Sequence, residues 1–163
     1  MTESTTGSPP ENTAQMAQRV FGEQFAAILA QEPGVRLGEV EAIHDMRVAT
    51  RRLRVTLINF SACWTKAERQ QLKFWLQRLA DALGEARDLD VLMDSLKPKQ
   101  MQLSAAERPL FTNLIERLRQ QRKRRFQALL LFLASETYLS FKREAPRLMV
   151  RPATSPASPQ TNG

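Results

Sequence analysis

Apolar residues recur every three or four positions along most of this chain, and this spacing constrains the fold more than any other feature. It places apolar side chains on one face of an α-helix, whereas a half-buried strand needs alternation at every second position. No alternating segment is found. The expected fold class is therefore all-α, a four-helix bundle with short connections. Helices are predicted at residues 12–31, 39–62, 66–97 with a break near Gly84, 106–134 and, as a short piece, 137–144.

Prolines and capping residues mark the expected ends of these helices. The pair Pro33-Gly34 is expected to end the first helix, and Pro109 to lie in the first turn of the fourth. Thr65 and Ser104 stand at expected N-caps, and a glutamate three residues after Ser104 completes the spacing of a capping box.

The chain has 163 residues, 42% of them hydrophobic, which is enough for one domain with a core. Residues 12–144 are expected to form this helical bundle. Residues 1–11 and the Pro/Ser-rich residues 145–163 are expected to be disordered tails, because they hold too little apolar surface to fold.

A net charge of +7 indicates an anionic partner, such as nucleic acid, an inorganic phosphate polymer or an acidic membrane. The single cysteine, Cys63, excludes an intrachain disulfide and favours a reducing compartment. The first residues lack the pattern of a secretory signal. The longest apolar run, residues 128–134, is too short for a bilayer, which needs about 20 residues. A cytoplasmic protein that does not enter membranes is expected.

The second predicted helix carries a row of cations beside its core stripe. His44, Arg47, Arg51 and Arg54 follow one another at spacings of three, four and three, so they share one edge of the helix. Like charges at these spacings repel, and no glutamate is interleaved. Carboxylates of a neighbouring helix are one possible complement. A bound anion is the second possible complement, and an aligned row of this length favours it.

Two arginines of the fourth predicted helix, Arg122 and Arg125, lie in line with its apolar stripe and point inward. An inward guanidinium requires a buried carboxylate or a bound anion, unless its long stem carries the charge to the edge of the bundle. If an anion binds there, two basic helix faces could converge on one channel.

The third predicted helix adds Lys73, on one edge with Arg69, and Arg87 as further candidates for the basic lining. Asp88 and Asp90 are natural acceptors for arginines of the second helix.

Metal binding and catalysis find little support. Asp88 and Asp90, with Asp94 as a third candidate ligand, lie at spacings that place the first two on opposite sides of a helix. The chain has one histidine, no Gly-rich phosphate loop and no nucleophile with a histidine partner. No metal, no cofactor and no enzymatic activity are therefore expected.

Two segments resemble motifs of the CHAD family, the conserved histidine α-helical domain. They are Glu41-Ala-Ile-His-Asp-Met-Arg-Val-Ala-Thr-Arg-Arg-Leu-Arg54 and, about thirty residues later, Leu83-Gly-Glu-Ala-Arg-Asp-Leu-Asp-Val-Leu92. The resemblance implies an all-helical fold that binds inorganic polyphosphate in a central basic groove, often at polyphosphate granules, without catalysis. The matching positions imply that the basic row of the second helix binds the polyphosphate. Arg87 and Asp88 match the family's second motif.

The sequence departs from the family pattern in two respects. Family members are typically longer, with two related halves facing each other across the groove, and this sequence resembles the first half. In the third helix, Gln77 replaces a common basic residue and leaves Lys73, four positions earlier, as the nearest cation on the same edge. Two copies could pair about a two-fold axis to complete the groove, or the half could be a degenerate remnant with weakened binding.

Three functions therefore follow from the sequence. The first is non-catalytic polyphosphate binding by residues His44, Arg47, Arg51, Arg54, Lys73, Arg87, Arg122 and Arg125, supported by ion pairs of Asp88 and Asp90. The second is nucleic-acid binding, which the scarcity of aromatic residues near the cations disfavours. The third is a helical interaction module whose arginines form internal ion pairs.

Overall fold

The computed structural model describes residues 12–150, and the side chains of residues 12–148. Within this range the chain is helical and contains no strand, which confirms the predicted all-α class. In chain order the elements are α1 (Thr13–Leu37), α2 (Val40–Asn59), the short 3-10 helix η1 (Ser61–Cys63), α3 (Lys66–Leu96), the 3-10 helix η2 (Lys97–Gln102), α4 (Arg108–Leu133) and α5 (Glu136–Val150).

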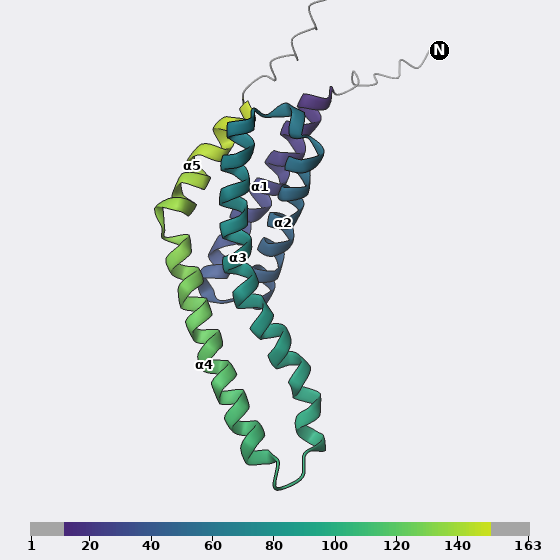
Figure 1. Cartoon of the computed structure of the whole chain (residues 1–163), viewed down its shortest axis with the longest axis vertical. Helices are drawn as coiled ribbons and strands as arrows, with labels where there is room; N and C mark the ends of the chain where they lie inside the picture. The colour runs from purple at the N-terminus through teal and green to yellow at the C-terminus, as the bar shows by residue number, and fades with distance from the viewer. Residues whose placement is uncertain (1–11, 151–163) are drawn as a thin grey trace, which may run out of the picture.

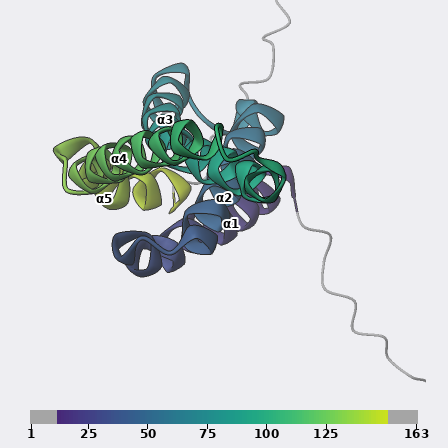
Figure 2. The same cartoon turned by 90° about the horizontal axis from the view of Figure 1, so that it is seen from below.

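The helices form a bundle from which one hairpin projects (Figure 1). α1 and α2 lie side by side, and the first half of α3 packs against α2. The second half of α3 continues beyond these two helices, and α4 returns beside it. α5 then runs along α1 and α3, so that it and the end of α4 fill the fourth position of the bundle (Figures 1 and 2).

The core lies between α1, α2, α3 and α5. An aromatic cluster joins three of these helices, since Phe141 of α5 meets Phe25 of α1 edge-on at 5.2 Å between ring centroids and Trp75 of α3 at 6.1 Å. Of the apolar stripe expected on the second helix, Met46, Ala49, Leu53 and Leu57 are buried in α2, whereas Phe60 lies just after the end of α2 and is half-buried. This burial fixes which face of α2 remains outside.

The expectation that Pro33-Gly34 ends the first helix is wrong, because α1 continues to Leu37. The helix ends instead at Gly38, whose φ of 79° is the left-handed conformation that glycine adopts readily. Gly34 has a different purpose, which is close packing. A Cβ on Gly34 would lie 2.7 Å from the Cβ of Ala42, so the missing side chain lets α2 approach α1.

Two further boundaries differ from expectation. α3 is continuous through Gly84, so the predicted break is absent. Residues 145–150, expected in the C-terminal tail, belong to α5 even though Pro146 lies inside that helix. Ala145 is fully buried, and packing of this turn against the core explains why the helix persists. The remainder of both predicted tails, residues 1–11 and 151–163, lies outside the described residues.

The predicted starts of the helices agree with the structure better than the predicted ends. Thr65 caps α3 in a complete capping box with Glu68, and Pro109 lies in the first turn of α4. Ser104 does contact the expected Glu107, whose carboxylate accepts from the Ser104 amide at 2.9 Å and hydroxyl at 2.6 Å. However, α4 begins at Arg108, directly after Glu107, so the prediction that Ser104 is its N-cap is wrong.

None of the described helices combines the length and the apolar character that crossing a bilayer requires.

Candidate anion-binding site

The basic row of α2 lies outside the core, as its spacing predicts. His44 and Arg54 are half-buried, whereas Arg47 and Arg51 are exposed. No ion pair is described for any of these four residues. Neighbouring carboxylates therefore do not complete the row within the described part of the chain, and its charge remains available to an anion.

The row does not line one continuous cavity. Arg51 lies at a groove between α1 and α2, together with Val20, Gln24 and the opposite-flank Arg52. Arg54 instead faces α3. The curvature of the helix surface thus separates two residues that the spacing places on one edge.

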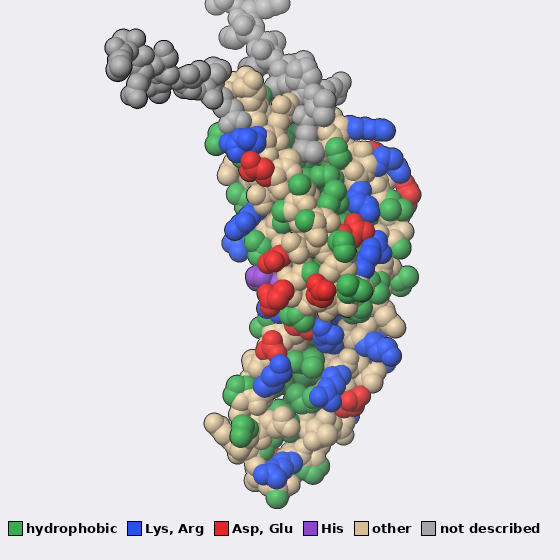
Figure 3. All heavy atoms as spheres, turned by 180° about the vertical axis from the view of Figure 1, so that it is seen from behind, with side chains coloured by type: hydrophobic (Ala, Val, Ile, Leu, Met, Phe, Trp, Pro, Cys, Tyr) green, Lys and Arg blue, Asp and Glu red, His purple; other side chains and the backbone are tan. Residues whose placement is uncertain are grey.

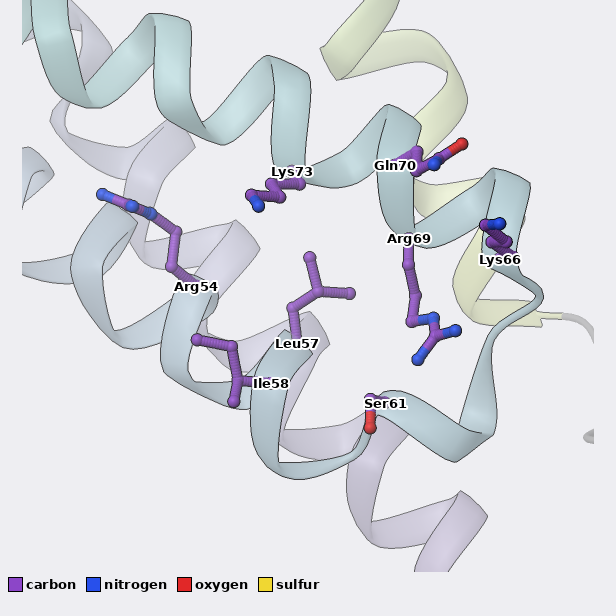
Figure 4. A pocket seen from close by; sticks show the side chains of 8 residues that line it. All are labelled: Arg54, Leu57, Ile58, Ser61, Lys66, Arg69, Gln70 and Lys73. Atoms are coloured by element: carbon purple, nitrogen blue, oxygen red, sulfur yellow. The ribbon is translucent and has the colours of Figure 1, made fainter.

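Arg54 borders a pocket of about 450 Å³ between α2 and α3. Three further cations surround this pocket from the α3 side, and Leu57 and Ile58 supply apolar surface between them (Figure 4). No carboxylate lines the pocket, and no ion pair is described for its cations. The complete lining consists of Arg54, Leu57, Ile58, Ser61, Lys66, Arg69, Gln70 and Lys73.

Two of these cations, Lys66 and Arg69, were not among the predicted site residues. Their signal is visible in the sequence, since Lys66, Arg69 and Lys73 follow one another at spacings of three and four, as the arginines of α2 do. The capped start of α3 at Thr65 fixes the position of Lys66. The basic row of α3 therefore faces Arg54 of α2 across one depression.

Arg87 lies farther along α3. It is fourteen residues after Lys73, which corresponds to about 21 Å of helix at ~1.5 Å per residue. Its side chain is half-buried, and its Nη1 atom is enclosed without a hydrogen-bond partner in the protein. A buried guanidinium donor normally bonds to a protein group, water or an anion. Arg87 thus keeps a free donor but does not line the α2–α3 pocket.

Arg122 and Arg125 have carboxylate partners on α3. The Arg122 Nε donates to Asp90, and Arg125 Nη1 lies 2.6 Å from Glu85 Oε2. Asp90 is only 6% exposed, so it is the buried carboxylate that an inward Arg122 requires. These pairs join α4 to α3, and neither arginine lines the α2–α3 pocket. The structure therefore does not bring the basic faces of α2 and α4 together around one channel.

The two predicted supporting aspartates also behave differently from each other. Asp90 supports Arg122 of α4, so the expectation that it holds an arginine of α2 is wrong. Asp88 is exposed, and no ion pair is described for it. No group of three or more His, Cys, Asp or Glu residues that could hold a metal ion occurs in the described part of the chain.

Comparison with known proteins assigns the chain to a family. A family model described as "CHAD domain" matches residues 19–162, and the chain therefore belongs to the CHAD family. CHAD domains are in general polyphosphate-binding domains.

Two relatives come from Mycobacterium tuberculosis. The uncharacterized protein Rv2226 of strain ATCC 25618 / H37Rv is 34% identical over 119 residues, and the uncharacterized protein MT2285 of strain CDC 1551 / Oshkosh is 33% identical over 119 residues. Each match covers 72% of this chain but 23% of the relative, so the chain corresponds to less than a quarter of either protein. No solved structure matches significantly.

Proposed function

We propose that this chain binds inorganic polyphosphate, without catalysis, along the basic surface of α2 and α3. The observation that carries the proposal is the α2–α3 pocket, where Arg54, Lys66, Arg69 and Lys73 surround a depression with no carboxylate in its lining. Cations gathered without acidic partners repel one another, and a polyanion relieves this repulsion. Arginine also binds phosphate oxygens with two parallel hydrogen bonds.

The outer row of α2 adds cations beyond this pocket to the proposed binding surface. His44, Arg47 and Arg51 continue from Arg54 toward the start of α2, and Arg87 lies farther along α3, where its Nη1 is enclosed and has no protein partner. A flexible chain of phosphates can follow such a surface from one cation to the next. In this proposal Arg122 and Arg125 mainly hold α4 against α3, because carboxylates already neutralise them. Association with polyphosphate granules would follow from such binding.

Isothermal titration calorimetry with long-chain polyphosphate tests the proposal. The double substitution Arg69→Ala/Lys73→Ala is expected to weaken binding at least about tenfold, which corresponds to ~1.4 kcal/mol. A charge-matched control, Lys99→Ala/Arg108→Ala, removes two exposed cations far along the chain from the pocket. It is expected to change the affinity less than about threefold. Equal losses in both variants would contradict the site, and no binding by the parent chain would contradict the function.

Salt and competing ligands sharpen the same titration. Binding by counterion release predicts that the logarithm of the affinity falls linearly as the logarithm of the salt concentration rises. Single-stranded DNA serves as the second ligand, because net charge alone would admit it. The pocket offers no aromatic side chain for base stacking, so weaker binding of DNA is expected at equal salt. Tighter binding of DNA than of polyphosphate would favour the nucleic-acid function instead.

A further inference from the structure

The hairpin formed by the second half of α3 and by α4 is sparsely buried. Among residues 87–121, the buried side chains within these two helices are Asp90 and Leu118. Large apolar side chains nevertheless remain at its surface, where Leu92 and Leu114 are 43% exposed and Leu110 is 74% exposed. Hydrophobic side chains are visible on the hairpin below the bundle in Figure 3. Exposed apolar residues on so small a unit indicate an interaction surface.

These leucines follow regular lines along their helices. Leu89, Leu92 and Leu96 are spaced by three and four on α3, and Leu110 and Leu114 are four apart on α4. Such spacing is that of a helix-packing seam. The α4 line continues through Arg117, Gln121 and Arg124. Leu89 and Arg124 border the same depression, so both lines lie on one side of the hairpin.

The charged part of this face has opposite signs on its two helices. α3 contributes Glu85 and Asp88, whereas α4 contributes Arg117 and Arg124. Asp88 and Arg124 border one depression, are both exposed, and have no described ion pair. The face is therefore leucine-rich near the tip of the hairpin and, nearer the bundle, acidic on one helix and basic on the other.

We propose that two copies of this chain associate through this leucine face, defined by Leu89, Leu92, Leu96, Leu110 and Leu114, about a two-fold axis parallel to the hairpin. This axis brings leucines against leucines and α3 of one copy against α4 of the other. Asp88 then meets Arg124 of the second copy. An axis perpendicular to the hairpin would instead place the leucines of one copy against the charged residues of the other. That arrangement is disfavoured, because it would bury charged side chains without partners.

Size-exclusion chromatography with multi-angle light scattering on the full chain, without polyphosphate, tests the dimer. Leu114→Glu is expected to raise the dimer dissociation constant more than about tenfold, because it places a charge at the centre of the interface. Leu110→Glu provides a second variant at a more exposed position. Val91→Glu is the matched control, since Val91 is 52% exposed but lies outside the leucine lines. Circular dichroism checks that each variant is folded.

A monomeric parent chain at every concentration would overturn the proposal, as would an equal effect of Val91→Glu. Charge exchange tests the direction of the axis. Asp88→Arg and Arg124→Asp are each expected to weaken the dimer, and the double variant to restore it. Failure of the double variant to restore association would overturn the proposed arrangement. None of these measurements involves polyphosphate, so their failure would leave the binding proposal untouched.

Discussion

Asp90 is the one charged side chain that is buried among the described residues, and it decides the role of Arg122. Its carboxylate accepts from Arg122 through one oxygen, while its other oxygen, Oδ2, has no hydrogen-bond partner in the protein. The sequence allowed either an anion or a carboxylate to satisfy Arg122. The carboxylate makes this arginine a link between α3 and α4, separate from the exposed cations of α2.

Replacing Asp90 by alanine is expected to lower the free energy of unfolding by about 2–3 kcal/mol, because Arg122 then loses its partner in a partly buried position. The value is below that of a fully buried pair because Arg122 remains 32% exposed. Urea denaturation measures the change. Glu85→Ala removes the other α3–α4 ion pair, whose partners are both 52% exposed, and should cost less than about 1 kcal/mol. Equal losses would contradict the distinction between the two pairs.

Glu32 is a further carboxylate with a structural role. Although burial raises its pKa, hydrogen bonds from Arg36, Lys142 and Tyr138 outweigh this effect and hold the pKa below 4.5. Burial and the neighbouring Glu32 charge raise the pKa of Tyr138, so its hydroxyl remains a donor to Glu32 at 3.0 Å. These bonds join α1 to α5.

A lowered folded-state pKa means that the ionised Glu32 stabilises the fold fully above its unfolded pKa. This contribution is lost as the pH falls from about 4.5 through the lower folded value. Glu32→Gln is therefore expected to reduce stability at neutral pH and to flatten the acid side of the stability profile. Urea denaturation between neutral pH and pH values below 4.5 measures both effects. An unchanged acid slope in the variant would contradict this role.

At the scale of the element, the helix start at Thr65, the α2 core stripe and the position of Pro109 could be predicted, because each depends on residues within a few positions. The continuation of α1 past Pro33 and of α5 past Pro146 could not. Packing of buried side chains against distant helices outweighs the local preference of proline there.

The candidate site also has features that local sequence predicts and features that depend on distant contacts. The cations of α2 and their outward orientation follow from helical spacing. The partners of Arg122 and Arg125 lie 32 and 40 positions away in the sequence, and no local pattern predicts such contacts. Lys66 joins the pocket because α3 folds back against α2, which the pattern of either helix alone does not specify.

Two glycines of α1 provide a matched test of helix packing. Gly34→Ala is expected to destabilise the fold, because the new Cβ would lie 2.7 Å from Ala42 Cβ and 2.6 Å from Glu39 Oε2. Gly22→Ala should instead stabilise it by about 0.5–1 kcal/mol, since no atom lies within 4 Å and alanine favours a helix. Thermal and urea denaturation compare the two. Stabilisation by both substitutions would contradict the close approach of α2 at Gly34.

At the scale of the whole molecule, the positive charge is distributed unevenly. The α2–α3 pocket is lined by cations without acidic residues, whereas the projecting hairpin combines an acidic helix edge with a basic one. A polyanion and a second copy of the chain would therefore use different surfaces. Salt should weaken polyphosphate binding strongly, and the leucine-based association less, because apolar contacts are not screened.

The uninterrupted α3 crosses both parts of the molecule. Its first half is held between other helices, while its last turns have α4 as their main support. Cooperative unfolding depends on buried contacts, so the two ends of this single helix should open with different free energies. Hydrogen exchange followed by mass spectrometry is expected to show faster exchange in residues 91–115 than in residues 70–84. Uniform protection along α3 would contradict this expectation. A continuous helix thus does not imply a single cooperative unit.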